Sequence, residues 1–128
     1  YIDVSGFMHE ELPKICGLLR NMGSYLSEVY QFSNDVYRST LKDLADGNIK
    51  STGGTDFNCI IDSAVNHGER KIVIITDGYA DADKKRREKA KANIDKAMVI
   101  LTGGWNNENN WFSTTYNSQT YKLDELVK

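Results

Sequence analysis

Carboxylate and hydroxyl side chains lie at the ends of two apolar runs in this sequence. Asp3 ends a short strand-like run at the start of the chain and Ser5 follows it, while Asp77 closes the run IVIIT. Between them, the glycine pair of STGGTD lets a loop that carries Thr55 approach closely, because glycine adopts backbone angles that other residues avoid. An oxygen-only group of this kind suits a hard divalent cation. The four side chains are therefore candidate metal ligands, provided that the fold brings them together.

The elements that would position these residues follow from the hydrophobic pattern. Residues 70–78, RKIVIITDG, form a continuous β-branched run, which is typical of a strand buried on both faces of a parallel sheet, and residues 97–104 predict a second such strand. Helical spacing appears over residues 8–22, 57–68 and 81–96. Strands that alternate with helices predict an α/β fold with a doubly wound, mostly parallel sheet and helices on both faces. In such a sheet, ligands bind beyond the carboxyl ends of the strands.

The remaining segments predict the edges of the sheet. Residues 27–39 hold two short β-rich runs around the turn signal SND, so we expect an antiparallel pair of strands there. Residues 41–49 predict a short helical turn. The tail, residues 105–128, begins as an Asn-rich loop, and its residues 119–123 and 124–128 predict a last edge strand and a short helix.

Length and composition indicate one globular domain that covers residues 1–128. The chain has 40% hydrophobic residues, 27% charged residues and a formal net charge of -2, which gives no general attraction to polyanions. Its apolar runs are far shorter than the about 20 residues that cross a bilayer, so no membrane association is expected. Because the chain opens on Tyr1 with a strand already under way, we expect a domain excised from a larger protein.

The cysteines indicate neither zinc nor a disulfide framework. Cys16 and Cys59 lie far apart, and the sequence contains no C-x-x-C pair. Both fall on expected helices among apolar neighbours, where a cysteine behaves as a small buried hydrophobe. This usage favours a reducing compartment such as the cytoplasm.

Three motifs in order, DVSG, GGTD and IVIITDG, resemble those of the von Willebrand factor A-type domain with its metal-ion-dependent adhesion site. The resemblance covers nearly the whole chain, and EVYQFSNDVY is similar to the second and third strands of that family. It implies a Rossmann-like sheet with strand order 3-2-1-4-5-6. It also implies a protein-interaction domain rather than an enzyme, in which Mg²⁺ completes its coordination with a carboxylate from a partner protein.

The resemblance assigns the metal ligands by position. Asp3 and Ser5 match the first motif, Thr55 the second and Asp77 the third. Phe7 departs from the pattern, because it replaces the second serine hydroxyl of the first motif. Water could replace that ligand, or Phe7 could crowd the site and leave a degenerate crevice without metal. Magnesium is preferred over calcium because hydroxyl and water ligands outnumber carboxylates.

Three further residues belong to the rim of the expected site: Phe7, Asp56 and Gly78. Asp56 directly follows Thr55 and precedes a helix, so a helix cap is favoured over a metal ligand. Asp81 and Asp83 could add negative potential at the rim, and an acidic first turn of the next helix explains them equally well.

Two other functions remain as alternatives. A haloacid-dehalogenase-like phosphotransferase would use Asp3 as the nucleophile, but its acid/base carboxylate two residues later is replaced by Ser5. An RNA-linked regulatory domain similar to that of Ro-type proteins would use the basic residues of the segment 84–91. Because Asp83 and Glu88 are interleaved with those basic residues, a solvated outer helix is favoured.

Aromatic residues and histidines are the remaining candidates for ligand binding and catalysis. Four aromatic residues near the end of the chain are expected to cover an open edge of the sheet, and a stacking platform for a ligand is the alternative. These residues are Trp105, Trp111, Tyr116 and Tyr121. His9 and His67 have no serine or cysteine partner at a recognisable spacing, so nucleophilic catalysis is not expected.

Overall fold

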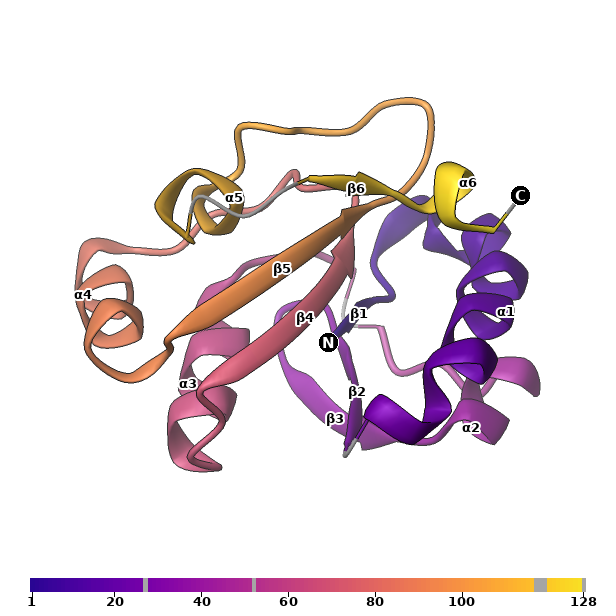
Figure 1. Cartoon of the computed structure of the whole chain (residues 1–128), viewed down its shortest axis with the longest axis horizontal. Helices are drawn as coiled ribbons and strands as arrows, with labels where there is room; N and C mark the ends of the chain where they lie inside the picture. Colours follow the sequence, from indigo (N-terminus) through magenta and orange to yellow (C-terminus); the bar gives the residue numbers. More distant parts are fainter. Residues whose placement is uncertain (27, 52, 117–119, 128) are drawn as a thin grey trace.

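Six strands form one sheet in the order β3-β2-β1-β4-β5-β6 in the computed structural model, which describes residues 1–26, 28–51, 53–116 and 120–127. Neighbouring strands run parallel, except for the antiparallel pair β2 and β3 at one edge (Figure 1). The strands are β1 (Ile2–Asp3), β2 (Val29–Phe32), β3 (Val36–Ser39), β4 (Lys71–Thr76), β5 (Lys96–Leu101) and β6 (Tyr121–Lys122). The expected α/β sheet, its antiparallel edge strand and its strand order are therefore confirmed.

Helices cover both faces of the sheet (Figure 1). One face packs against α3, α4 and α5, and the other packs against α1, α2 and α6. The helices are α1 (Leu12–Met22), α2 (Leu41–Ala45), α3 (Asn58–Asn66), α4 (Lys84–Asn93), α5 (Trp111–Tyr116) and α6 (Leu123–Leu126). Two 3-10 segments, η1 (Gly6–Glu11) and η2 (Gly23–Tyr25), flank α1.

Residues 72–75 of the central strand β4 are all apolar, and they contribute to the hydrophobic cores on both faces of the sheet. Ile72 and Ile74 belong to the core under α3, α4 and α5, whereas Ile75 belongs to the core under α1 and α2, with Val73 packed against it. Burial of each such side chain stabilises the fold by about 1.5–3 kcal/mol. The strand therefore holds its carboxyl end, and Asp77 after it, in a fixed place.

The first helix differs from the expected span of residues 8–22. Residues Gly6–Glu11 form the 3-10 segment η1, and the α-helix begins only at Leu12. An α-helix that started at Met8 would require the residue after Leu12 to donate its backbone N–H to His9, and Pro13 has none. In the observed helix Pro13 lies in the first turn, where a missing N–H costs least.

The tail contains one helix that the sequence did not predict. Asn110 is buried, and its Oδ1 accepts a hydrogen bond of 3.0 Å from the Ser113 amide, so it caps α5. The expected edge strand and final helix are observed as β6 and α6. Residues 119 and 128, which belong to those expected segments, lie outside the described part of the chain.

The expectation that the aromatic residues cover a sheet edge is wrong for Trp105, whose side chain is 87% exposed. Trp111 and Tyr116 pack against each other and against Phe112 in α5. Tyr121 lies on the edge strand β6 itself. Trp105 differs because it lies in the loop between β5 and α5, beyond the end of the sheet.

Both cysteines are free. Cys16 is buried in α1, and Cys59 is half-buried in α3. Burial, together with the charge of Asp56, raises the pKa of Cys59 to about 12, so its thiol stays protonated and unreactive at neutral pH. Across the residues that the structure describes, every helix is too short or too polar to cross a membrane.

Candidate functional site

The candidate site begins where β1 and β4 end side by side. These two strands are parallel neighbours, with Ile2 opposite Ile75, so Asp3 and Asp77 reach the same carboxyl edge of the sheet. Strand order reverses here, because β1 lies between β2 and β4. In open α/β sheets this switch point is where ligands bind.

Asp3 is fully buried and accepts hydrogen bonds at both carboxylate oxygens. Its Oδ1 accepts from the backbone N–H of Ser5 at 2.9 Å and from the Ser5 hydroxyl. Its Oδ2 accepts from the Thr76 hydroxyl at 2.7 Å. These bonds fix the carboxylate in one orientation between β1 and β4.

Thr55 joins this group from a separate loop, because its hydroxyl donates a hydrogen bond to Ser5 Oγ. The loop turns at Gly53, whose φ of +95° is a conformation that favours glycine. The next residue, Asp56, ties the loop to the β2–β3 turn through a 3.1 Å hydrogen bond from its N–H to the carbonyl of Ser33. The hydroxyls of Thr55 and Ser5 therefore form a chain that ends on Asp3.

Asp77 is half-exposed and lies close enough to affect Asp3. Burial raises the pKa of Asp3, and repulsion from the Asp77 carboxylate raises this pKa further, while the bonds from Ser5 and Thr76 lower it. Asp77 Oδ1 accepts a 3.0 Å hydrogen bond from the N–H of Tyr79, which holds the carboxylate in a tight turn. The structure thus brings Asp3, Ser5 and Thr55 into one hydrogen-bonded group, with Asp77 beside it.

Gly78 positions the loop after β4 rather than contributing a ligand. Its φ is +85°, and a Cβ atom there would lie 2.5 Å from the backbone oxygen of Asn107. Asn107 in turn donates its N–H to the Asp77 carbonyl at 2.7 Å and its side-chain amide to the Gly78 carbonyl at 3.3 Å. Hydrogen bonds from Asn107 in the loop after β5 therefore hold the loop that carries Asp77 in place; we call this pair of bonds the Asn107 clamp.

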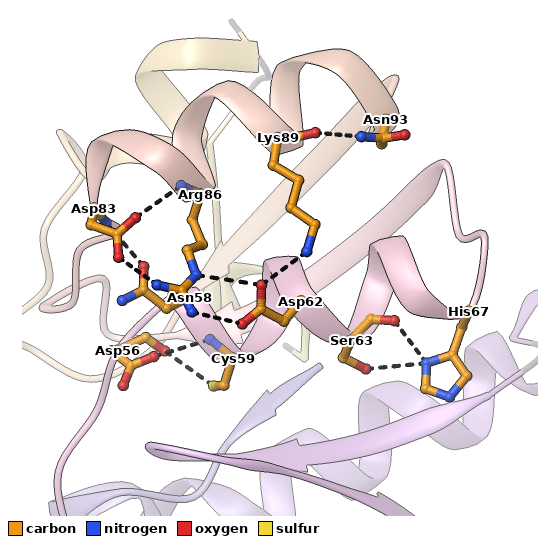
Figure 2. Close-up of polar contacts among 10 residues, drawn as sticks. All are labelled: Asp56, Asn58, Cys59, Asp62, Ser63, His67, Asp83, Arg86, Lys89 and Asn93. Atoms are coloured by element: carbon orange, nitrogen blue, oxygen red, sulfur yellow. Dashed lines mark hydrogen bonds and ion pairs between the residues drawn. The ribbon is translucent and has the colours of Figure 1, made fainter.

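The structure describes the side chain of Asp56, another expected rim residue, but not that of Phe7. Asp56 Oδ1 accepts a 3.0 Å hydrogen bond from the Cys59 amide, so its carboxylate caps the first turn of α3, as favoured from the sequence (Figure 2). The backbone of Phe7 belongs to η1, and its side chain lies outside the described part of the structure.

The two acidic residues before α4 both contact arginines of that helix. Asp83 Oδ1 accepts a 2.9 Å hydrogen bond from the Arg86 amide and caps α4, and this bond lowers the pKa of Asp83. Asp81 forms an ion pair with Arg87. The first turn of α4, which the structure describes in full, holds no acidic residue, so the expected acidic first turn is not observed. Asp83 is instead the cap of the helix, and Asp81 lies in the loop before it.

The basic helix α4 directs several of its charges to carboxylates on the protein itself. Arg86 and Lys89 both lie 3.3 Å from Asp62 of α3, and Figure 2 shows the two cations meeting at that carboxylate. Ala90 is the buried residue of the helix, so α4 is the solvated outer helix that the sequence favoured. Arg86, Arg87 and Lys89 of this helix thus form ion pairs with carboxylates of the same protein.

His67 has a serine neighbour that the sequence pattern did not indicate. Its Nδ1 lies 3.3 Å from the Ser63 hydroxyl and 2.7 Å from the Ser63 carbonyl oxygen, one helical turn away (Figure 2). A carbonyl oxygen can only accept a hydrogen bond, so this Nδ1 carries the proton. The ring nitrogen therefore cannot remove a proton from Ser63, and the pair is not an activated nucleophile.

Thr76 belongs to the buried group, although it was not predicted from the sequence. Its hydroxyl donates to Asp3 Oδ2 and accepts a 3.1 Å hydrogen bond from the Gly78 amide, so it links β1 to the Asp77 loop. The available signal was a polar residue at the end of a strand that is otherwise apolar and buried.

Replacing Thr76 with valine should destabilise the protein by about 2 kcal/mol, because Asp3 Oδ2 and the Gly78 amide would both lose a buried partner. Thr102 is the matched control, because it is buried one residue beyond the end of β5 and its hydroxyl donates to the weakly accepting sulfur of Met8, at 3.2 Å. The Thr102→Val variant should lose less than about 1 kcal/mol. Urea denaturation of both variants measures the difference, and equal losses would contradict the role of Thr76.

Taken together, these features define a Rossmann-like α/β domain with an oxygen-lined group at the carboxyl edge of its sheet. No family model matches the chain, and no curated protein matches it. Among solved structures, the chain is similar to proximal thread matrix protein 1 (PTMP1) from the mussel byssus, with a TM-score of 0.58 and 16% sequence identity. That match covers 98% of this chain and 43% of the mussel chain, so this chain spans less than half of that protein. The likeness supports the fold.

Proposed function

We propose that this chain is a non-enzymatic protein-interaction domain of the von Willebrand factor A type. Its side chains would hold a divalent cation that takes a carboxylate from a partner protein. Asp3, Ser5, Thr55 and Asp77 would bind the cation, at the positions that the sequence resemblance assigns. The single observation that carries the proposal is the hydrogen-bonded chain from Thr55 through Ser5 to Asp3, with the Asp77 carboxylate beside it.

The directions of these hydrogen bonds fit a cation site. Ser5 donates its hydroxyl proton to Asp3, so the lone pairs of Ser5 Oγ are turned away from that carboxylate. The Thr55 hydroxyl donates to one of these lone pairs of Ser5 Oγ. If the Thr55 hydroxyl rotated, that lone pair of Ser5 would be free to bind a cation. Both hydroxyls can therefore act as neutral oxygen ligands next to the Asp3 charge.

The donor set also fits a hard cation. Among the described residues, no three His, Cys, Asp or Glu side chains gather as a metal group, so a cation here would depend on the two hydroxyls as well as on the two carboxylates. Oxygen ligands of this kind suit Mg²⁺, which keeps several waters and uses few carboxylates. A positive charge would also relieve the repulsion between Asp3 and Asp77 that raises the pKa of Asp3.

A bound cation would supply an open coordination position for an acidic side chain. A carboxylate from a partner could enter it only at the exposed edge of the sheet, where Asp77 is half-exposed while Asp3 is fully buried. Charge-assisted contacts in a shielded crevice are specific, because a neutral replacement of the carboxylate loses them.

A titration of Mg²⁺ into the isotope-labelled domain tests this proposal. We expect the backbone amide signals of Asp3, Ser5, Thr55 and Asp77 to shift together at low millimolar metal, because their side chains would gain a shared ligand. Sodium chloride at matched ionic strength is the control for general salt effects. No movement of these signals at millimolar Mg²⁺, beyond that seen with sodium, would mean that the group is a hydrogen-bonded relic.

A further inference from the structure

We infer that two exposed aromatic side chains beside the candidate cation site select which carboxylate the partner presents. These two residues, Tyr79 and Trp105, form what we call the aromatic rim. The partner would then offer an acidic side chain with an aromatic or aliphatic group next to it. This inference rests on the proposed function, because it concerns the partner of the same site.

The aromatic rim is tied directly to Asp77. The backbone N–H of Tyr79 donates to Asp77 Oδ1 at 3.0 Å, so this ring projects from the same turn as the candidate ligand. The Tyr79 hydroxyl donates to the carbonyl oxygen of Asn106 at 3.4 Å, next to Trp105 in the sequence. The two rings therefore belong to adjoining loops at the carboxyl edge of the sheet.

Both aromatic rings are accessible to a partner. Tyr79 is 56% exposed and Trp105 is 87% exposed, although tryptophan is on average a highly buried residue. Another exposed aromatic, Tyr25, lies in η2 before the start of β2, which is the amino end of the parallel strands. Tyr79 follows Asp77 in the same turn, and Trp105 belongs to the loop that contacts this turn through Asn106 and Asn107, so both lie at the carboxyl edge of the sheet. Tyr25 provides a natural control at the other edge.

The loops under the aromatic rim are held in place before any partner arrives. Asn107 bonds the carbonyls of Asp77 and Gly78, and Asn110 donates to the carbonyl of Asn107 at 2.9 Å. A fixed backbone lowers the entropy that is lost when a partner binds. Tyrosine and tryptophan on such a backbone offer large contact area with few rotatable bonds, which is why they dominate binding hot spots.

The aromatic rim adds what a cation alone cannot provide. A cation held by the candidate ligands would accept any carboxylate of suitable reach, and would not distinguish one acidic side chain from another. Contact with Tyr79 and Trp105 favours an apolar or aromatic neighbour, because such pairs gain both buried area and ring-to-ring attraction. The aromatic rim would therefore determine which acidic partner binds, and the cation would make binding depend on the partner's negative charge.

Three small probes with Mg²⁺ test this inference: propionate, 3-phenylpropionate and 3-phenylpropylamine. We expect 3-phenylpropionate to bind about five- to ten-fold more tightly than propionate, as judged by shifts of the Trp105 indole N–H and the Asp77 amide. In the Tyr79→Ala/Trp105→Ala variant the two acids should bind equally, followed at the Asp77 amide, while Mg²⁺ affinity stays the same. The Tyr25→Ala variant is the matched control and should keep the preference. The amine, which carries the same ring and the opposite charge, should gain nothing from Mg²⁺.

The outcomes separate the inference from the proposed function. If Mg²⁺ itself causes no shift at Asp3, Thr55 and Asp77, both fail. If Mg²⁺ binds but the two acids bind equally to the unmodified protein, the cation site stands and the aromatic rim has no selective role. The rim is likewise not selective if 3-phenylpropylamine binds as tightly as 3-phenylpropionate in the presence of Mg²⁺, because the ring alone would then explain the contact.

Discussion

Replacing Asp77 with asparagine is expected to weaken Mg²⁺ binding about 100-fold while leaving the fold unchanged, since even outer-shell partners of metal ligands contribute 10- to 100-fold. Asparagine keeps the oxygen that accepts the Tyr79 amide at 3.0 Å, so the turn after β4 survives. What the substitution removes is one negative charge and one cation ligand. Because Asp77 is half-exposed, the neutral amide also leaves no buried group without a partner.

A second acidic residue of the same loop gives the matched control for this substitution. Asp81 accepts a 2.8 Å hydrogen bond from the Ala82 amide, so Asp81→Asn also keeps its local bond and removes one negative charge. Because the Asp81 carboxylate already pairs with Arg87, the Asp81→Asn substitution should change Mg²⁺ affinity by less than about three-fold. Isothermal titration of both variants measures the ratio. Equal losses would assign the effect to general charge, and no loss in either would remove Asp77 from the ligand set.

The fold could be predicted because its central elements carry strong local patterns. Strands β4 and β5 are unbroken apolar runs, and β2 and β3 flank a clear turn signal. The order of the strands depends on pairing between distant segments, and it came from the family resemblance alone. The two-residue strand β1 is too short for any periodicity, and the motif DVSG, which begins at its last residue Asp3, supports its position.

The candidate site was predictable only in part, for a physical reason. Ser5 and Thr55 could be associated with Asp3 through spaced motifs, and the structure joins all three through hydrogen bonds. Thr76 could not, because its hydroxyl reaches Asp3 only in the register that sets Ile2 opposite Ile75. A hydrophobic pattern can specify register, but β1 has only two residues to provide one.

Loop packing was the least predictable feature. The exposure of Trp105 and the clamp from Asn107 both depend on how the loop after β5 lies across the loop after β4. Asparagine and glycine indicate that a loop is present, but they do not say which backbone groups it will meet. The contact between these two loops is nevertheless where the largest effect of a single methyl group is expected.

Adding that methyl group, Gly78→Ala, should destabilise the protein by about 3–5 kcal/mol, from the left-handed backbone angle and from overpacking together. The φ of Gly78 is +85°, and the new Cβ would lie 2.5 Å from the backbone oxygen of Asn107 and 3.2 Å from Leu101 Cδ2. A backbone atom cannot move aside as a flexible side chain does. Relief would therefore require the loop after β5 to shift, which breaks the Asn107 bonds to Asp77 and Gly78.

Gly68 separates the two causes of that loss, because it has a similar φ of +68° and open space around its Cβ position. Gly68→Ala should cost about 1–2 kcal/mol, which is the backbone penalty alone. Urea denaturation of both variants gives the difference, and equal losses would show that the contact between the loops is soft. If the contact is rigid, the backbone amide signals of Asp77 and Asn107 should shift together in Gly78→Ala. The hydrogen bonds from Asn107 join the two loops, so one loop cannot move without the other.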